Sequence, residues 1–450
     1  MKKVSKILAV FVAVLMFSSV LAGCKSTKKT PTTTGVANIT YALWGGDTEA
    51  ATTQKVLDKF NASQTHIHVT CIPIDHDTYV EKLNTMATAG TLPDTAIMSE
   101  AAVIQWATQG KLADVSTMYA GSAAPLPQLA FKYNGKTVAY SAANEVLLMY
   151  YNKKMFDAAG VAYPPTTADK AWTWDQFIAA AKKLTIDKNG KTADAAGFDS
   201  STIKQYGAMV ENLTWQLEEW CLSNGGGFVN SAGTALSIGD SASTDAIQKV
   251  ADLYLVNHVA PLSTGLTDDG VPRSIVAGTC AMTTNGAWNI GTCLPDATKA
   301  GLSYGVAVLP YMQNKVTLCT GGPNVVFSTT KYPKEAMTFL KWYDSADNNW
   351  DLISSGIWMP ITSDYYTDST LTNKWLNNPN FPTFADSKSV LVDYAQNNTK
   401  QACWYYSNNI SDFETLLGSV LGNVWTGKVT AQKAISDNLT ALNTAFKGNS

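Results

Sequence analysis

The feature that most constrains the fold of this chain is an alternation of short apolar runs with longer amphipathic segments. Residues 38–44, 67–74 and 95–98 are short, largely apolar or β-branched runs, which is typical of strands. Residues 48–61 and 79–89 lie between them and repeat apolar side chains at the spacing of one helix face. This order predicts an α/β fold with a mostly parallel sheet and helices on both of its faces.

The three predicted strands end in polar residues or glycine, at positions 44–47, 75–77 and 99–100. In parallel sheets, ligands bind beyond the carboxyl ends of the strands. The strand ends therefore supply three candidate ligand-binding residues: Trp44, Asp47 and Glu100. Asp47 is also placed to cap the helix that follows it, and the two roles are compatible.

Length and composition set the broad class of protein. The chain has 450 residues, too many for one ordinary core, which indicates two lobes. Only 15% of its residues are charged, below the usual quarter, while Trp (13) and Tyr (19) are abundant. The net charge is −3 and no basic run occurs beyond the N-terminal region, which argues against nucleic acid as a partner.

The N-terminal residues have the pattern of a secretory signal. Three lysines precede an uncharged run that ends in small residues before Cys24, so residues 1–23 are predicted to be a signal peptide. A retained membrane-spanning helix is the alternative, and the small residues weaken it. Residues 24–37 are rich in Thr and Lys, which predicts a flexible tether. The segment Leu21-Ala-Gly-Cys24 resembles the bacterial lipobox, which implies a lipid anchor on Cys24 and an extracytoplasmic location at the cell membrane.

Cysteine and histidine spacing favours simple structural roles. No CxxC or paired spacing appears among the other cysteines, so we expect buried free thiols and assign no disulfide to any of them: Cys71, Cys221, Cys280, Cys293, Cys319 and Cys403. His66 and His68 share one strand face, with His76 not far beyond. A zinc site there is possible in principle, and a solvated strand face is the interpretation we favour.

Enzyme signatures are weak throughout the sequence. A glycosidase needs two carboxylates about 5 Å or 6.5–9.5 Å apart, and no recognisable pair stands out among the many acids. No GxSxG motif occurs, and the four histidines fit no catalytic signature. No P-loop occurs, so energy for any transport must come from a separate ATPase. We expect a binding protein without catalytic residues, cofactor or bound metal.

Several ordered motifs then identify a family. They are LWGGD (43–47), TAGTLPD (88–94), QGKLADVS (109–116), YNGKTVAYSAANEVLLMYYNK (133–153), SNGGGFVN (223–230), VAGTCAMTTNGAWNIG (276–291), YGVAVLP (304–310), TGGPNVVFS (320–328) and KEAMTFLKWY (334–343). With these motifs in this order, the chain resembles the extracellular solute-binding proteins of carbohydrate ABC importers, the family that includes maltodextrin-binding proteins.

That resemblance implies a periplasmic-binding-protein-like fold, with two discontinuous α/β lobes joined by a hinge and a ligand cleft between them. The implied boundaries are residues 38–141 plus 319–357 for the first lobe and 142–318 plus 358–450 for the second. The implied function is capture of a sugar or oligosaccharide by lobe closure, followed by delivery to the permease subunits of an ABC transporter. The implied receptor is a monomer.

A sugar site needs aromatic rings for the C–H faces of the sugar and carboxylate or amide groups for its hydroxyls. By resemblance, Asp47 and Glu145 match carboxylates of the family's sugar site, and Trp288 and Trp404 match its stacking tryptophans. Strand ends and glycine turns add further candidates: Trp44, Glu100, Tyr151, Trp215, Gly322 and Trp358. In a chain with 13 tryptophans, packing in the core is the alternative role for each of them.

Two alternatives stay open at this point. Met98 stands where the maltodextrin binders have a cleft tryptophan, and Ala101 stands at their next acidic position, which argues against maltodextrin itself though not against sugars. The same fold could hold a polyamine or another small polar solute, which an acid-rich cleft would favour. A secreted carbohydrate-active enzyme is the weaker alternative.

Overall fold

The first of two sheets has six strands, in the order β2-β1-β3-β12-β5-β4. The computed structural model describes residues 35–44, 47–75, 78–121, 123–262, 274–292, 294–299, 301–377 and 379–447. The strands of this sheet are β1 (Ala37–Trp44), β2 (Ile67–Ile74), β3 (Thr95–Ile97), β4 (Ala130–Tyr133), β5 (Lys136–Ser141) and β12 (Pro323–Val326).

Strand direction in the first sheet follows the sequence expectation only in part. β1 pairs in parallel with β2 and with β3, as the strand–helix alternation predicts. β12 is antiparallel to both β3 and β5, and β4 is antiparallel to β5. The sheet is therefore mixed rather than mostly parallel, because β12 reaches it from a distant part of the chain and β4 and β5 form a hairpin.

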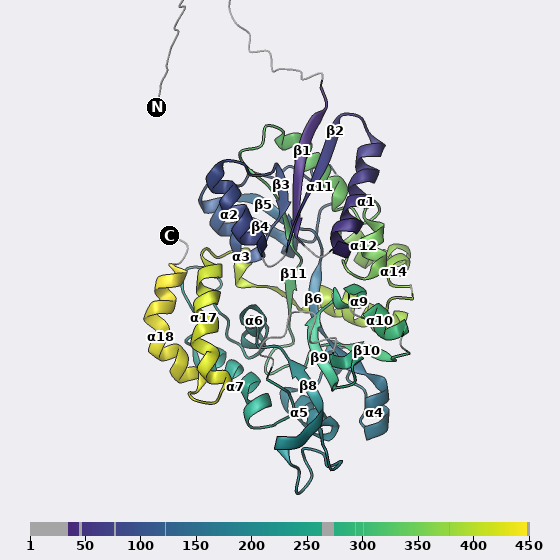
Figure 1. The fold of residues 1–450 in the computed structure, drawn as a ribbon, viewed down its shortest axis with the longest axis vertical. Helices are drawn as coiled ribbons and strands as arrows, with labels where there is room; N and C mark the ends of the chain where they lie inside the picture. The colour runs from purple at the N-terminus through teal and green to yellow at the C-terminus, as the bar shows by residue number, and fades with distance from the viewer. Residues whose placement is uncertain are drawn as a thin grey trace, which may run out of the picture. The chain divides into compact units, whose positions relative to one another are not determined.

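Helices cover both faces of this sheet, with α1 and α11 on one side and α2 and α3 on the other (Figure 1). Their bounds are α1 (Asp47–Ser63), α2 (Tyr79–Ala89), α3 (Glu100–Thr108) and α11 (Pro333–Tyr343). Tyr41 of β1 is fully buried and its ring packs on Phe339 and Tyr343 of α11, with centroids 5.4 and 5.3 Å apart. This aromatic core holds α11 on the sheet.

The second sheet has seven strands, with β13-β11-β6-β9-β8-β7 in order and β10 also paired to β6. Their bounds are β6 (Glu145–Asn152), β7 (Ile186–Asp187), β8 (Ile203–Val210), β9 (Cys280–Gly286), β10 (Tyr304–Ala307), β11 (Thr317–Thr320) and β13 (Thr399–Gln401). Every residue of β6 is buried, so this strand lies at the centre of the part of the molecule that is built on the second sheet. This part is called the second half, and the part built on the first sheet is called the first half. β8 and β9 are parallel, and β6 is antiparallel to β9.

Two groups of helices accompany the second sheet and the C-terminal region. The longer ones are α4 (Lys153–Ala159), α5 (Trp174–Leu184), α6 (Thr214–Ser223), α7 (Ser241–Leu255), α14 (Ser369–Leu376), α17 (Ile410–Trp425) and α18 (Ala431–Phe446). The shorter ones are α9 (Asn289–Thr292), α10 (Leu294–Lys299), α12 (Trp350–Ser355), α13 (Asp364–Thr367), α15 (Phe384–Ser387) and α16 (Ala395–Asn398), with a π-helix at η5 (Lys388–Tyr394) and a 3₁₀ turn at η6 (Cys403–Tyr405). α17 and α18 pack together and against α6 and α7.

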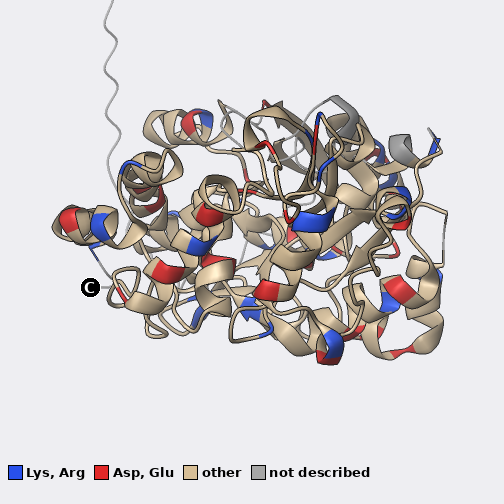
Figure 2. Ribbon diagram, turned by 90° about the horizontal axis from the view of Figure 1, so that it is seen from below, with Lys and Arg blue, Asp and Glu red and all other residues tan. Residues whose placement is uncertain are grey.

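Surface charge and hydropathy are unremarkable over this part of the molecule. Lys, Arg, Asp and Glu residues alternate along the helices in the view of Figure 2. Among the described residues, no helix is both long enough and apolar enough to cross a membrane. The predicted signal peptide, Cys24 and residues 25–34 of the predicted tether lie outside the described residues, and Ala37, the last residue of the predicted tether, begins β1 instead.

Candidate functional site

Two of the passages that carry the chain between the sheets are hydrogen-bonded to each other. Residues 142–144 lead from β5 to β6, and residues 321–322 lead from β11 to β12. The Ala143 N–H donates to the Gly321 carbonyl oxygen at 3.1 Å. Gly321 has a φ of +146°, and a Cβ at this position would lie 1.9 Å from the Ala143 carbonyl oxygen. Only glycine fits this close approach, which fixes where the second passage lies.

Glu145 is placed at this junction as the first residue of β6, and it is 4% exposed. Its Oε1 accepts a hydrogen bond from the Met359 N–H at 3.0 Å. Its Oε2 accepts no hydrogen bond from the described residues. Burial raises the pKa of Glu145 to about 8, although the Met359 and Trp288 N–H groups favour the charged form. A buried carboxyl group with an unused oxygen is costly unless a polar partner binds it.

Three of the predicted tryptophans form one cluster beside this carboxyl group. Trp215 is the second residue of α6, Trp288 follows β9, and Trp404 lies in η6. The ring centroids of Trp215 and Trp288 are 6.4 Å apart, and those of Trp215 and Trp404 are 6.2 Å apart. Trp215 and Trp288 are half-buried, whereas Trp404 is 3% exposed and its Nε1 has no hydrogen-bond partner among the described residues.

The position of Trp288 depends on a glycine at the end of β9. A Cβ at Gly286 would lie 1.8 Å from the Trp288 ring, so the ring folds back over the bare backbone of this residue. The turn that follows β9 therefore needs glycine for packing rather than for backbone conformation. This arrangement leaves the Trp288 N–H close to Glu145, as its effect on the pKa of that carboxyl group indicates.

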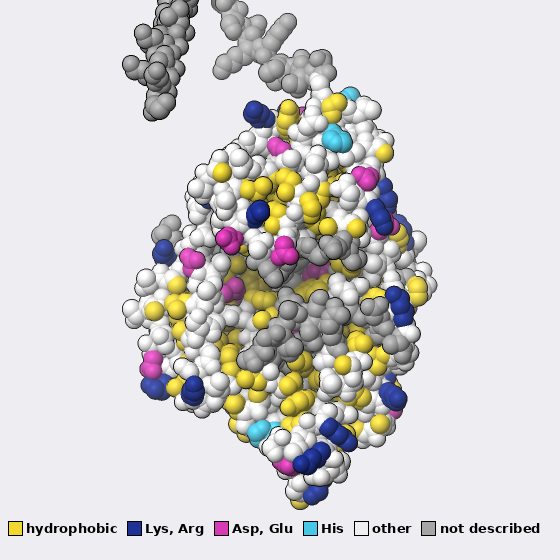
Figure 3. All heavy atoms as spheres, viewed as in Figure 1, with side chains coloured by type: hydrophobic (Ala, Val, Ile, Leu, Met, Phe, Trp, Pro, Cys, Tyr) yellow, Lys and Arg dark blue, Asp and Glu magenta, His cyan; other side chains and the backbone are white. Residues whose placement is uncertain are grey.

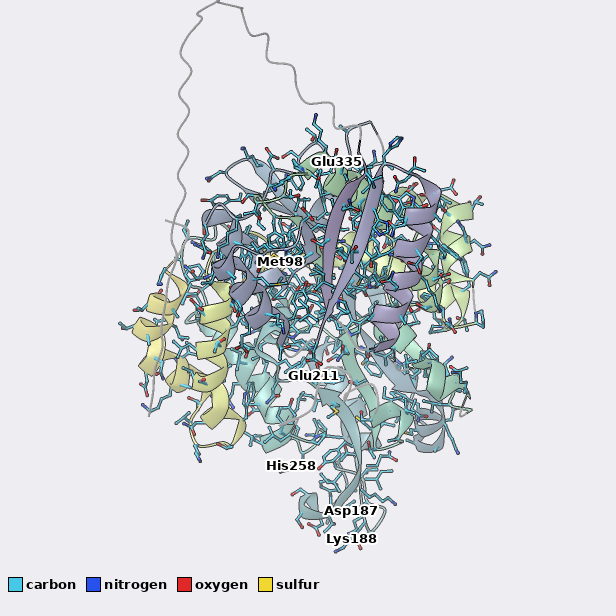
Figure 4. The ribbon with its side chains drawn as sticks, turned by 45° about the horizontal axis from the view of Figure 1, so that its top comes forward. Met98, Asp187, Lys188, Glu211, His258 and Glu335 are labelled. Atoms are coloured by element: carbon cyan, nitrogen blue, oxygen red, sulfur yellow. The ribbon has the colours of Figure 1, made fainter. Side chains whose placement is uncertain are left out.

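Further buried acids near the cluster were missed in the sequence. Glu211 directly follows β8, is 2% exposed, and accepts a hydrogen bond from Gln216 Nε2 at 2.5 Å. Figure 4 shows Glu211 near the middle of the molecule, far from Asp187 and Lys188 at the end of the second half. Asp47 became a candidate because it lies just beyond the carboxyl end of a predicted strand. Glu211 lies in the same position after β8, so the same pattern could have identified it.

Two glutamates of α6 bind backbone groups instead of solvent. Glu218 Oε2 accepts from the Cys403 N–H at 3.0 Å, and Glu219 Oε2 accepts from the Leu318 N–H at 2.6 Å. Burial raises the pKa of Glu218 to about 7 and that of Glu219 to about 8. Glu218 therefore holds η6, which carries Trp404, and Glu219 holds β11. On the sequence alone, both acids read as the solvated face of a helix.

Glu100 also binds the backbone, from the first half. It is half-buried at the start of α3, and its Oε1 accepts from Thr320 Oγ1 at 2.6 Å. The same oxygen accepts from the N–H groups of Gly321 and Gly322, at 3.2 and 3.1 Å. Glu100 therefore contacts the second passage between the sheets.

Trp44, another candidate of the first half, lies beside this passage. Trp44 ends β1 and packs edge-on against Tyr79, with ring centroids 5.3 Å apart. A Cβ at Gly322 would lie 3.2 Å from the Trp44 ring, which places this ring beside the passage. Trp358 is half-buried, directly precedes Met359, and packs on Tyr343 at 5.8 Å. Figure 4 shows Met98 above Glu211, and it is 2% exposed.

Two candidates do not join these groups. Tyr151 lies six residues along β6 from Glu145, which corresponds to roughly 20 Å of extended chain. Its ring packs on Phe156 and Tyr163, each with centroids 5.3 Å away, at the other end of the second sheet. Asp47 begins α1, as a capping residue would, but its side chain lies outside the part of the chain that the structure describes.

The surface over the junction is hollowed. Figure 3 shows hydrophobic and acidic side chains around a hollow across the middle of this face. A different surface groove, of about 480 Å³, lies at the far end of the second sheet beside Asn152 and Lys154, and no candidate residue lines it. Among the described residues, no group of three or more His, Cys, Asp or Glu side chains is arranged to hold a metal ion. Cys71, Cys221, Cys280, Cys319 and Cys403 are free thiols.

Comparison with known protein families decides the class of this site. Residues 45–350 match the family model of the bacterial extracellular solute-binding proteins. The chain belongs to this family. Its curated relatives include the sn-glycerol-3-phosphate-binding periplasmic protein UgpB of Rhizobium meliloti, 24% identical over 370 residues that cover 75% of this chain and 78% of the relative. The UgpB protein of Brucella melitensis is 25% identical over 55% of this chain and 54% of its own length.

Solved structures of similar fold include sugar complexes. The solute-binding protein Lmo0181 of Listeria monocytogenes, in complex with cycloalternan, has a TM-score of 0.74 at 21% identity and covers 92% of this chain and 100% of its own. A binding protein of Thermotoga lettingae with bound α-D-tagatose has a TM-score of 0.75 at 20% identity, covering 91% and 100%. Maltose-bound MalE3 of T. maritima has a TM-score of 0.70 at 20% identity, covering 91% and 100%.

These comparisons confirm two of the sequence predictions. The solute-binding family is confirmed by its model, and the periplasmic-binding-protein-like α/β fold is confirmed by the solved structures. The family is extracellular, so this solute-binding protein works outside the cytoplasm. The sugar ligand, the individual binding residues and the anchor stay predictions.

Proposed function

We propose that this solute-binding protein captures a sugar or oligosaccharide by lobe closure and presents it to the permease of an ABC transporter. The observation that carries this proposal is Glu145, a buried carboxyl group with one unused oxygen beside the cluster of Trp215, Trp288 and Trp404. Aromatic rings bind the C–H faces of a sugar, and a carboxyl oxygen accepts from its hydroxyl groups. Closure of the lobes excludes water and strengthens those bonds.

Two other ligand classes fit the site less well. A glycerol phosphate, as bound by the UgpB relatives, needs cationic partners for its charge, whereas the candidate residues of this site offer carboxyl groups and aromatic rings. The single arginine of the chain, Arg273, lies outside the described residues. A polyamine needs ionised carboxylates, but burial raises the pKa of Glu145 to about 8 and that of Glu218 to about 7, and both already bind backbone N–H groups. A neutral polyhydroxylated ligand avoids both difficulties.

The proposed lobes follow the two sheets. The first sheet takes its strands from residues 37–141 and 323–326, and the second takes its strands from residues 145–320 and 399–401. These ranges support the boundaries predicted from the family, with the second passage at Gly321 and Gly322 rather than at Cys319, because β11 lies in the second sheet. The paired passages are then the hinge about which the lobes close.

The remaining parts of the proposal rest on the sequence. Residues 1–23 are removed as a signal peptide, Cys24 carries the lipid, and residues 25–36 let the lobes reach the permease. The receptor is a monomer and binds its ligand without turnover.

A ligand screen with purified protein tests this function. We expect a saturable rise in melting temperature with one or more of maltose, maltotriose, cycloalternan and tagatose, because a ligand that binds only the folded state stabilises it. Glycerol 3-phosphate and spermidine should give no shift, and chromatography after long incubation should recover the sugar unchanged. A saturable shift with glycerol 3-phosphate or spermidine alone would overturn the proposal, and hydrolysis of an oligosaccharide would favour an enzyme.

A further inference from the structure

A single carboxylate oxygen joins the first half of the molecule to the passage between the sheets. Glu100 Oε1 accepts hydrogen bonds from the Thr320 hydroxyl at 2.6 Å and from the N–H groups of Gly321 and Gly322 at 3.2 and 3.1 Å. Bonds of this kind are stronger than neutral ones when the acceptor is charged. One side chain of α3 thus binds Thr320, the last residue of β11, and both residues of the passage.

The backbone of the passage is shaped for this acceptor. Gly321 and Gly322 have φ values of +146° and +58°, which residues with a side chain rarely adopt. Successive N–H groups in such a turn point toward one anion, an arrangement known as a nest. The glycines therefore serve two purposes: they allow the close approach to Ala143, and they direct two N–H groups at Glu100.

The passage in turn contacts residues of the proposed sugar site on both sides. Thr320 pairs with Glu145 in the β11–β6 ladder. Gly322 lies against Trp44, since a Cβ there would be 3.2 Å from its ring. The position of this short segment therefore sets where the carboxyl group of the second sheet and the aromatic ring of the first sheet lie relative to each other.

We propose that Glu100 is a positioning residue, which holds the second passage so that Glu145 and Trp44 face one ligand, and that it does not bind the ligand itself. This inference rests on the proposed sugar capture and assigns Glu100 a role different from the direct contact expected from its place after a strand. It also explains why an acid stands at the start of α3, where a carboxylate is further stabilised by the helix N-terminus.

Three variants test the proposal: Glu100→Gln, which keeps shape and removes charge, Thr320→Val, which removes one donor, and the double variant. The first readout needs no ligand. Hydrogen exchange at the amides of Gly321 and Gly322, followed by mass spectrometry of peptides that cover residues 320–323, should be about tenfold faster in Glu100→Gln, since an amide oxygen accepts more weakly than a carboxylate. Unchanged exchange would overturn the proposal.

The second readout is sugar affinity by calorimetry. Each single variant should weaken binding by about threefold to tenfold, and the double variant no more than the weaker-binding single variant, because both act through one network. If Glu100→Gln weakens binding while Thr320→Val leaves it unchanged, Glu100 contacts the sugar directly and the proposal is wrong. If the wild-type protein binds no sugar, the proposed function fails, while the exchange experiment still decides whether Glu100 holds the passage.

Two further variants control for a general effect of removing an acid and for a failure of Glu100→Gln to fold. Glu335→Gln is the matched control, because Glu335 is an acid in the first turn of α11, in the same half of the protein, and Figure 4 shows it at the opposite end of that half from Glu211. It should leave exchange at residues 320–323 and sugar affinity unchanged, and an equal effect there would overturn the specific role of Glu100. If Glu100→Gln fails to fold, Thr320→Val alone decides: faster exchange that Thr320→Ser restores supports the proposal, and wild-type exchange overturns it.

Discussion

The facing edges of the two sheets differ in how their polar groups are used. At the edge of the first sheet, Glu100 binds the passage, and the Tyr79 hydroxyl donates to the Ile97 carbonyl oxygen at 2.6 Å. At the edge of the second sheet, Glu145 Oε2 and Trp404 Nε1 have no hydrogen-bond partner among the described residues. Buried polar groups normally find partners in a folded protein. The difference indicates that the second half supplies the ligand contacts and the first half supplies a closing surface.

The contrast has a physical origin in the strands themselves. β1 and β3 of the first sheet run directly into helices, so Asp47 and Glu100 become first residues of α1 and α3. In the second sheet, β6 begins at the junction with Glu145, and β9 ends in a glycine turn that folds Trp288 back over Gly286. Glu145 and Trp288 of the second edge thus come from a strand start and a turn rather than from the first residue of a helix.

The largest loss of stability should come from Gly321→Ala, which disturbs the close contact between the two passages. A Cβ there would lie 1.9 Å from the Ala143 carbonyl oxygen, at a φ of +146°. We expect a loss of more than about 3 kcal/mol in the free energy of unfolding, since backbone strain and a backbone clash combine. Urea denaturation measures this loss.

Gly160→Ala is the control for that substitution. Gly160 also has a positive φ, +62°, but a Cβ there meets nothing within 4 Å. It should therefore lose only about 1 kcal/mol, from backbone conformation alone. Equal losses for the two variants would mean that the close approach of the passages is not what the glycine protects.

The next effect tests which half binds the ligand. Trp288→Ala should weaken sugar binding by about 30-fold, or roughly 2 kcal/mol, as removal of a central aromatic contact does. Trp44→Ala should weaken it by only about threefold, because its ring lies at the closing surface. Calorimetry is suitable, since it does not depend on tryptophan emission.

Trp350→Ala is the matched control for these two variants. Trp350 is half-buried, and Lys374 Nζ lies 4.4 Å from the centroid of its ring. It should bind the sugar as the wild-type protein does. If Trp44→Ala loses as much affinity as Trp288→Ala, the two halves share recognition and the comparison above is wrong.

Much of the local structure could be predicted from the sequence, because strong start and stop signals mark it. The predicted helix at residues 79–89 is confirmed with its ends, and Gly90 caps it in the left-handed conformation. The helix at 174–184 has an equally clear start signal, a capping box formed by Thr173 and Gln176. Strand pairing was harder to predict, because β12 pairs with β3 and β5, which lie far from it in the sequence.

The site was predictable only in part. Trp288 and Glu145 stand at a strand end and a strand start, and the structure brings them together. Glu218 and Glu219 were missed because acids on an amphipathic helix look solvated until the tertiary structure buries them. Tyr151 was placed with the site because it lies near the end of its strand, but the site is at the start of that strand, beside Glu145.

The smallest effect concerns pH and buried acids in both halves. Asp344 accepts from Asn324 Nδ2 at 2.7 Å in the first half, and burial raises its pKa to about 7. Glu219 is its counterpart in the second half, with a pKa of about 8. Because these folded-state pKa values lie above the unfolded ones, the folded state holds more protons, so stability should fall as pH rises from about 5 to 8.

Substituting one acid at a time shows how much each half contributes to the loss of stability between pH 5 and pH 8. Asp344→Asn and Glu219→Gln should each reduce the loss of unfolding free energy between pH 5 and pH 8 by about 1 kcal/mol, measured by urea denaturation. Asp114→Asn is the control: hydrogen bonds from Ser116 lower the pKa of Asp114, so the contribution of Asp114 to stability changes only below this pH range.

The second half also holds Glu145 and Glu218, whose pKa values are about 8 and 7. Hydrogen exchange should therefore show that the core of the second half loosens more than the core of the first half as pH rises. Equal loosening of both cores would contradict the asymmetry between the two sheets.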